Sequence, residues 1–281
     1  MEPRAIRDLA QLGDDDLFSS VAEGLELIMK NVNRLYDGAE CLAGGKQFHV
    51  AHVITRAAEE EAAKFLILVD AIRCPRQPAD IFARQLQRFN SHLAKGLYAR
   101  AYNYRVSTGQ ELQGYIDLDR PEYYLDGPNG VDWIFRNDIV SGREAALYVD
   151  YERHDTGNLW TDPSRFEDMM FGLAEPEAVS VARSLHGVGF ASASALATVA
   201  EVWRSKKIGG STRWHDLFDM NVETLATLNQ RDQAAEQPDK VYQHIYNRWQ
   251  FPLYNLDLSP IPVDRDSLRA ARESWAPEGS Y

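Results

Sequence analysis

The 281-residue sequence lacks the features that mark several large protein classes. Its only two cysteines, Cys41 and Cys74, form neither a CxxC pair nor a metal-ligand spacing, which argues against a disulfide framework. The weakly charged run from Leu185 to Ala200 is rich in Ala, Ser and Gly, whereas a membrane-spanning helix needs about 20 strongly apolar residues. The first eleven residues have no signal-peptide core. We therefore expect a cytoplasmic protein with reduced, partly buried cysteines and no membrane segment.

Positive charge is scarce as well. Acidic residues number 42 against 30 lysines and arginines, so the net charge is −12. A protein of this charge repels polyanions at long range, and any nucleic-acid site must therefore be a local basic patch. The length and the apolar fraction of 44% suffice for one large domain or two small ones.

Common catalytic and nucleotide-binding motifs are missing. The sequence has no GxxxxGK[ST], GxSxG or HExxH pattern, which removes the main support for a P-loop, an α/β-hydrolase or a zincin site. His49 and His52 are three residues apart but have no evident third metal ligand, and Glu152 and His154 lack the spacing of a di-iron helix. We predict neither a metal nor a cofactor.

Apolar residues at three- and four-residue steps predict a protein built of helices. Acids at Asp14–Asp16 mark the first helix start, Gly44-Gly45 interrupts the chain, and Cys74-Pro75 ends the second helix. The expected helices run from Asp14–Asp16 towards Gly44, and over about 46–72, 78–104, 131–146, 175–205, 213–232 and 239–250.

The segments between these helices are rich in turn formers. Residues 107–130 carry several glycines and prolines and predict a loop-rich insertion, whereas Leu147–Tyr151 alternates as a short strand does, before a loop to about Ser164. Gly209-Gly210-Ser211 is a candidate hinge. From Phe251 onwards, four prolines predict an extended arm lying on the body or partly disordered. The predicted fold class is an all-α bundle with an insertion in its middle.

Polar residues step by four along the second helix. His52, Arg56, Glu60 and Lys64 form a slowly winding stripe, in which Glu60 and Lys64 are a favourable i, i+4 pair. Such a stripe is either a solvated face or part of a functional surface, and the spacing alone does not decide between them.

The third expected helix carries the most basic stretch. Between Ile81 and Arg105 there are five lysines and arginines, one histidine and no acid. On one continuous helix, Arg84, Arg88, His92 and Lys95 would share an arc of about 80°. Such an arc suits an RNA phosphate, although a lone helical histidine is more often a surface or capping residue than a catalyst.

Three segments carry a resemblance, in matching order across about residues 17–170. His49–Leu66 holds a His-containing helix leading into Glu60-Glu-x-x-Lys64, and Phe89–Lys95 holds His92-x-x-Lys95. Arg143–Tyr151 holds Leu-Tyr-Val-Asp and is followed by Trp160-Thr-Asp-Pro. These segments resemble the AbiV abortive-infection family of the HEPN superfamily. Nothing beyond residue 175 resembles that family.

The resemblance implies an HEPN-like up-and-down helical bundle over 1–173, usually a homodimer, used in bacterial defence against phage. Residues 174–281 would be a helical extension packed on the same body and ending in the proline-containing arm. Many HEPN relatives are metal-independent ribonucleases with an Arg and a His separated by four to six residues. Here three residues separate Arg88 from His92, and seven separate Arg84 from His92, so the motif does not match.

Two hypotheses about function follow. In the first, the protein cleaves RNA, with catalytic residues His92, Arg88, Lys95, Glu60 and Lys64 and with Arg84, Arg56 and Arg100 binding substrate. In the second, it is a non-catalytic helical protein that binds a phage or host protein. Arg88→Ala should leave an enzyme folded, but should unfold or monomerise a protein that uses Arg88 in a buried charge network.

Overall fold

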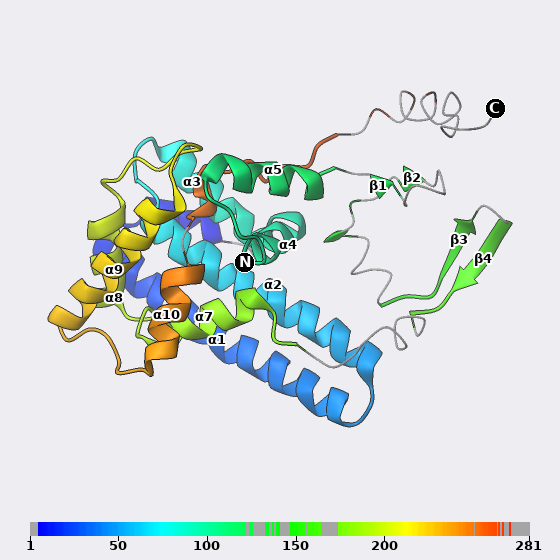
Figure 1. Ribbon diagram of the computed structural model, residues 1–281, viewed down its shortest axis with the longest axis horizontal. Helices are drawn as coiled ribbons and strands as arrows, with labels where there is room; N and C mark the ends of the chain where they lie inside the picture. The colour runs from blue at the N-terminus through cyan, green and yellow to red at the C-terminus, as the bar shows by residue number, and fades with distance from the viewer. Residues whose placement is uncertain are drawn as a thin grey trace.

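The computed structural model describes residues 5–121, 174–249 and 251–262, together with 124–125, 133–134, 137, 139–140, 147–154, 157–163, 264, 266 and 270. The fold class is all-α, as predicted, with two short antiparallel hairpins in the middle of the chain (Figure 1). The elements are η1 (Ile6–Gln11), α1 (Asp14–Gly44), α2 (Phe48–Arg73), α3 (Ala79–Gln87), η2 (Arg88–Asn90), α4 (His92–Ala101), α5 (Gly109–Asp119), β1 (Tyr124–Leu125), β2 (Trp133–Ile134), β3 (Asp150–His154), β4 (Gly157–Thr161), α7 (Glu177–Gly187), α8 (Ala193–Trp203), α9 (Trp214–Gln230), α10 (Asp239–Arg248) and η4 (Leu253–Asn255).

A long helical hairpin of α1 and α2 forms the frame of the molecule (Figure 1). Three acids in the first turn of α1 meet the positive end of its helix dipole, and the helix ends at Gly44, as predicted. Lys46 then adopts a φ of 61°, which lets the chain reverse within three residues. α1 buries the apolar stripe that its sequence periodicity predicts and packs on α2, which is buried on all sides from Phe65 to Arg73.

The prediction of one continuous helix over 78–104 is wrong. The chain forms α3, one turn of 3-10 helix, and then α4. Ser91 separates them because its backbone is extended, with φ −91° and ψ 120°, and its hydroxyl accepts a hydrogen bond from the Ala94 amide as the N-cap of α4. The four-residue arc of Arg84, Arg88, His92 and Lys95 therefore does not exist.

The expected loop at 107–130 is also wrong for residues 109–119, which form α5. Thr108 caps this helix by accepting from the Glu111 amide, and Glu111 in turn accepts from the Ser107 amide. This reciprocal arrangement satisfies two amides at the helix start and overrides the nearby glycines. Leu112 and Ile116 bury the inner face of α5.

The middle of the chain differs from the expected helix at 131–146 as well. Trp133–Ile134 pairs with Tyr124–Leu125 as strand β2, so that helix does not begin at Val131. Residues 139–140 are helical, and the rest of that prediction lies outside the described residues. The strand expected at 147–151 begins three residues later and pairs with β4, where a loop was expected.

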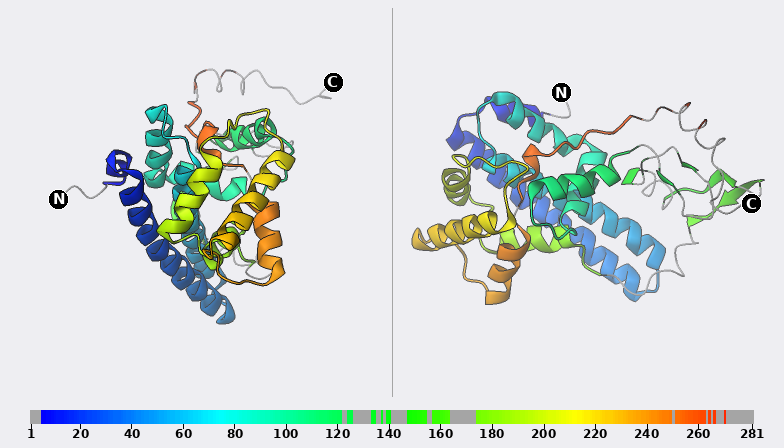
Figure 2. Two further views of the ribbon diagram at one scale, coloured as in Figure 1. Left: turned by 90° about the vertical axis from the view of Figure 1, so that its left-hand side faces the viewer. Right: turned by 45° about the horizontal axis from the view of Figure 1, so that its top comes forward.

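The expected helix 175–205 is two helices, α7 and α8. The break follows from Gly189, whose φ of +100° only glycine adopts readily, and Ser192 then caps α8. The helices expected near 213–232 and 239–250 are confirmed as α9 and α10. Both α7 and α8 pack on α1 and α2, so residues beyond 174 share the core of the N-terminal helices (Figure 2).

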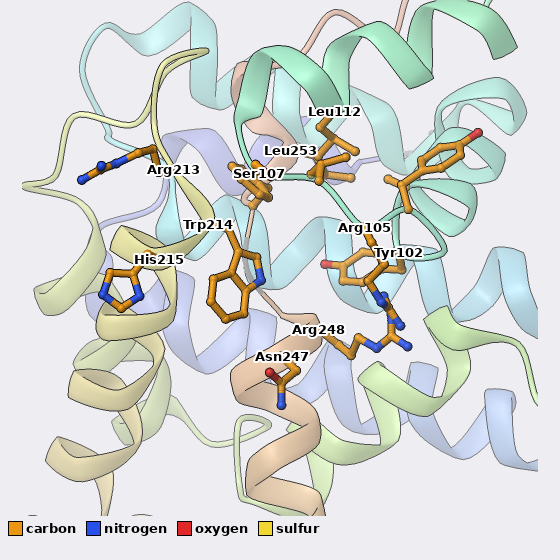
Figure 3. A pocket seen from close by; sticks show the side chains of 14 residues that line it. Tyr102, Arg105, Ser107, Leu112, Arg213, Trp214, His215, Asn247, Arg248 and Leu253 are labelled. Carbon is orange, nitrogen blue, oxygen red and sulfur yellow. The ribbon is translucent and has the colours of Figure 1, made fainter.

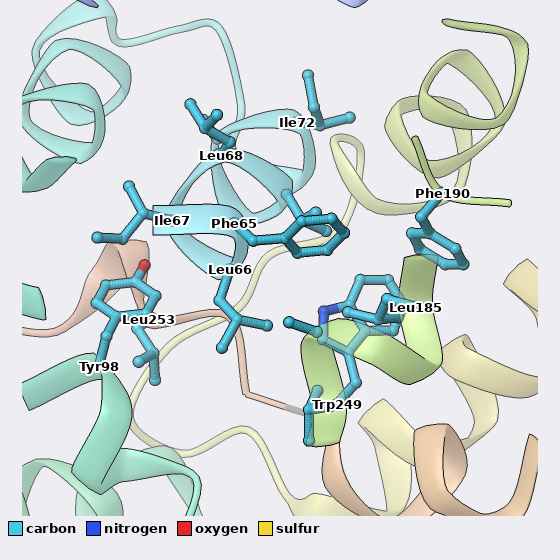
Figure 4. Close-up of a cluster of buried hydrophobic side chains, with 14 of the residues drawn as sticks. Phe65, Leu66, Ile67, Leu68, Ile72, Tyr98, Leu185, Phe190, Trp249 and Leu253 are labelled. Atoms are coloured by element: carbon cyan, nitrogen blue, oxygen red, sulfur yellow. The ribbon is translucent and has the colours of Figure 1, made fainter. Parts of the chain in front are cut away.

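Aromatic side chains fill the junction between the two parts of the chain (Figure 4). Trp203 and Trp249 are fully buried, and the Trp249 ring meets Phe190 edge-on at 5.0 Å. The arm after α10 lies on the body over residues 251–262, where Leu253 and Tyr254 are buried. Beyond Pro262, most of the predicted arm lies outside the described residues.

Gly189→Ala is expected to destabilise the protein by about 1–3 kcal/mol, because alanine is strained at this φ. A Cβ atom there would also lie 2.9 Å from the Gln233 carbonyl oxygen. Gly187→Ala is the matched control: its Cβ makes only ordinary contacts with Gln237, and alanine favours a helix. Thermal unfolding of both variants checks this, and equal melting temperatures would contradict it.

Candidate functional site

Glu60 on α2 contacts two basic side chains on α4. Its Oε2 atom lies 2.9 Å from His92 Nδ1 and 3.0 Å from Lys95 Nζ. The exposed fraction of the side chains is 51% for His92, 23% for Glu60 and 7% for Lys95. The three side chains thus form a cluster in which exposure to solvent decreases from the outward-facing histidine to the enclosed lysine. We call them the Glu60 cluster.

The break at Ser91 creates this cluster. Because α4 begins at His92, that residue and Lys95 stand one turn apart on the same side of a new helix that packs against α2. Ala94 between them is buried, which brings the helix close to α2. If the helix continued through Ser91 without a break, residues 92–101 would run in a different direction from that of α4.

The electrostatics favour an ionised Glu60. Burial opposes ionisation, but hydrogen bonds from Lys95 and His92 outweigh it and lower the pKa of Glu60. An ionised carboxylate only accepts hydrogen bonds, so His92 donates to it through Nδ1–H, which fixes the orientation of the imidazole ring. A carboxylate-oriented histidine of this kind is the usual partner in acid-base chemistry.

The other predicted site residues, on α2, α3 and α4, do not join this cluster. Lys64 lies 2.6 Å from Glu61 and 5.4 Å from the centre of the Phe89 ring. Arg56 lies 3.1 Å from Glu59. Arg100, at the far end of α4, pairs with Asp119 on α5. Arg84 is exposed on α3.

Arg88 does not join His92 at the surface. Only 6% of Arg88 is exposed, and its guanidinium group donates to Gln85 Oε1 at 2.9 Å, to the Leu253 carbonyl at 2.6 Å and to the Leu256 carbonyl. The structure thus gives Arg88 a position inside the molecule, holding the C-terminal arm. Truncating it is expected to destabilise the fold under either functional hypothesis, so Arg88→Ala does not separate them.

The network around Arg88 contains buried polar residues that the sequence interpretation missed. Asp70, Arg73 and Gln85 are fully buried. Gln85 Nε2 donates to the Tyr98 hydroxyl at 2.7 Å, and that hydroxyl donates to Asp70 Oδ2 at 2.9 Å. A signal was available, because Asp70 and Arg73 interrupt the apolar run of α2 at the i, i+3 spacing of an ion pair.

Metal binding finds no support in the described part of the chain. No group of three or more His, Cys, Asp or Glu residues there is arranged to hold a metal ion. Cys41 is exposed and Cys74 is buried, both as free thiols, and burial raises the pKa of Cys74 to about 12. None of the described helices combines the length and the apolar character that crossing a membrane requires.

Comparison with known protein families assigns the chain to one of them. A sequence model of the AbiV family of HEPN proteins matches residues 20–169, more than half of the chain. The chain belongs to the AbiV family. The match confirms the resemblance and supports an HEPN-type abortive-infection protein. It contains the Glu60 cluster and ends before α7. No curated protein and no solved structure matches the chain.

Glu60→Gln is expected to remove an acid-sensitive part of the stability. Because the folded state lowers the pKa of Glu60 from 4.5, its ionised form contributes stability above that pH, and the contribution is lost as pH falls through the folded pKa. Melting temperatures between pH 7 and pH 3 should therefore fall more for wild type than for Glu60→Gln. Glu23→Gln, at an exposed position of α1, is the control for loss of one carboxylate. Parallel profiles for wild type and Glu60→Gln would refute this.

Arg88→Ala is expected to lower the free energy of unfolding by about 1–3 kcal/mol for each buried acceptor left without its donor. Arg84→Ala removes an exposed arginine one turn earlier and should change stability by less than about 0.5 kcal/mol. Denaturant unfolding of the pair measures the difference. Equal stabilities would show that the arm is not held through Arg88.

Proposed function

We propose that this AbiV-family protein acts in phage defence as a metal-independent endoribonuclease whose acid-base site is the Glu60 cluster. The observation that supports the proposal is the single Glu60 oxygen that binds both His92 and Lys95 across two helices, with half of the histidine side chain exposed. Family membership supports the same class of activity, because ribonucleases are common among HEPN proteins.

In the proposed reaction, the RNA 2′-oxygen attacks the neighbouring phosphorus and gives its proton to His92. The P–O5′ bond breaks, the 5′-oxygen takes a proton from solvent, and a 2′,3′-cyclic phosphate remains. Glu60 is a positioning residue that orients the imidazole and stabilises its cationic form. Lys95 keeps Glu60 ionised and adds positive charge beside the phosphate.

Substrate would lie along α2 and the start of α4. Arg56 and Lys64 stand one turn before and after Glu60, so all three face a similar direction. Their side chains are 51% and 25% exposed, which leaves part of each cation open to phosphate although both are paired with acids. Arg84 and Arg100 would add charge at the margins of this surface. The net charge of −12 makes such local cations necessary for RNA binding.

The proposal includes a cytoplasmic homodimer, as the family resemblance implies, in which two Glu60 clusters would act on one RNA. A phage or host protein would serve as the trigger. Light scattering of the purified protein gives the subunit number directly.

The alternative is a non-catalytic interaction protein. The burial of Arg88 and Lys95 favours this alternative, because a substrate reaches a buried guanidinium or ammonium group less readily than an exposed one. In that case the Glu60 cluster stabilises the contact between α2 and α4 and the surface serves a protein partner.

His92→Ala is expected to abolish RNA cleavage in the presence of a chelator while leaving the melting temperature nearly unchanged, because the His92 side chain is half exposed. His186→Ala is the matched control: His186 on α7 makes a similar cross-helix pair with Glu26 at 3.2 Å, away from the cluster. Wild type and His186→Ala should both cleave RNA and leave a cyclic phosphate. Cleavage by His92→Ala at the wild-type rate would refute the site, and loss of cleavage in both variants would show a general structural effect.

A further inference from the structure

A pocket lies between the end of α4, the start of α5 and the helices α9 and α10 (Figure 3). Its volume is about 750 Å³, within the range of small-molecule pockets. Along α4 its nearest residue, Ala101, is about 13 Å from His92, so the hollow is separate from the Glu60 cluster. We call it the α5–α10 pocket.

Its charge is unusual for this acidic chain. Arg105, Arg213, Arg248 and His215 line the α5–α10 pocket, and no aspartate or glutamate does. Arg213 pairs with Asp216, and Arg248 pairs with Glu177, 2.9 Å away. Among the described residues Arg105 makes no ion pair, and it is exposed. The pocket therefore offers arginine donors, of which Arg105 has no acidic partner among the described residues, and such donors suit an anion.

Two buried polar groups at the pocket lack hydrogen-bond partners in the described part of the chain. They are the hydroxyl of Tyr102, a residue only 7% exposed, and the Nη1 atom of Arg248. Buried donors are usually hydrogen-bonded in folded proteins, and a ligand in the pocket that supplies acceptors would satisfy both groups. Burial raises the pKa of Tyr102, so its hydroxyl stays protonated and can donate.

An aromatic surface faces these donors. Figure 3 shows Arg105 and Arg248 extending towards the Tyr102 side of the pocket, with Trp214 across from them and Arg213 and His215 turned away. Trp214 is only partly buried, unlike Trp203 and Trp249. An indole ring of this kind is a stacking platform for a flat heterocycle.

We propose that the α5–α10 pocket binds a mononucleotide. Its phosphate would accept hydrogen bonds from Arg105, Arg248 and the Tyr102 hydroxyl, and its base would stack on Trp214. Ser107 and Asn247, which also line the pocket, supply a hydroxyl and an amide for the edge of the base. Inorganic phosphate alone would fill only a small part of the volume. This ligand site is additional to the proposed ribonuclease activity and does not depend on it.

Calorimetric titration of the full chain with AMP, GMP, CMP and UMP tests the proposal, with adenosine and inorganic phosphate as partial ligands. At least one mononucleotide should bind, and at least tenfold more tightly than either partial ligand. Arg105→Gln should weaken its binding at least tenfold, whereas Arg34→Gln, which also removes one exposed arginine, from α1, should not. Trp214→Leu should weaken it as well.

Tyr102→Phe separates a ligand role from a structural one. Because the hydroxyl has no hydrogen-bond partner among the described residues, its removal should leave the melting temperature of the free protein unchanged and weaken mononucleotide binding. His92→Ala should bind the mononucleotide as wild type does, so a failure of the ribonuclease proposal remains distinguishable. The proposal is overturned if no mononucleotide binds, if Arg105→Gln and Arg34→Gln bind equally, if a partial ligand binds as tightly, or if Tyr102→Phe only lowers the melting temperature.

Discussion

The buried carboxylate of Asp70 is the interaction on which much of this structure depends. A charge at a fully buried position is costly unless every oxygen is satisfied, and here Arg73, the Tyr98 hydroxyl and the Leu253 amide satisfy it. The Arg73 guanidinium is itself enclosed by the rings of Trp203 and Trp249, at 4.4 Å and 4.2 Å from their centres. One carboxylate thus fixes α2, α4, α8 and the C-terminal arm relative to one another.

The same network sets the geometry of the Glu60 cluster. Gln85 and Arg88 connect the end of α3 to Tyr98 and to the arm, so the chain at the start of α4 is held from both sides. That constraint places His92 and Lys95 against α2. A polar core of this type specifies one arrangement of its helices, because any other would leave a buried charge without partners.

Much of the fold was predictable from sequence periodicity, and the exceptions have physical causes. α1 and α9 each bury one regular stripe, which spacing alone reveals, whereas α2 is buried on all sides from Phe65 to Arg73. The third helix was mispredicted because apolar spacing continues across Ser91, while the break depends on that residue's cap. The pairing of Glu60 with His92 and Lys95 joins two helices, and helix wheels describe only one at a time. The burial of Arg88 depends on carbonyls more than 160 residues away. The roles of the site residues stay predictions.

The C-terminal arm also has a consequence for the order of events during translation. Leu253 and Leu256 leave the ribosome after all the named α-helices, and until then Asp70 and Arg88 lack the backbone groups that complete their hydrogen bonds. The AbiV-matched segment, residues 20–169, therefore reaches its final packing only after Leu253 and Leu256 have been made. The hydrogen bonds of Asp70 and Arg88 near the start of α4 are completed last, so a chain that stops before the arm lacks the groups that complete them.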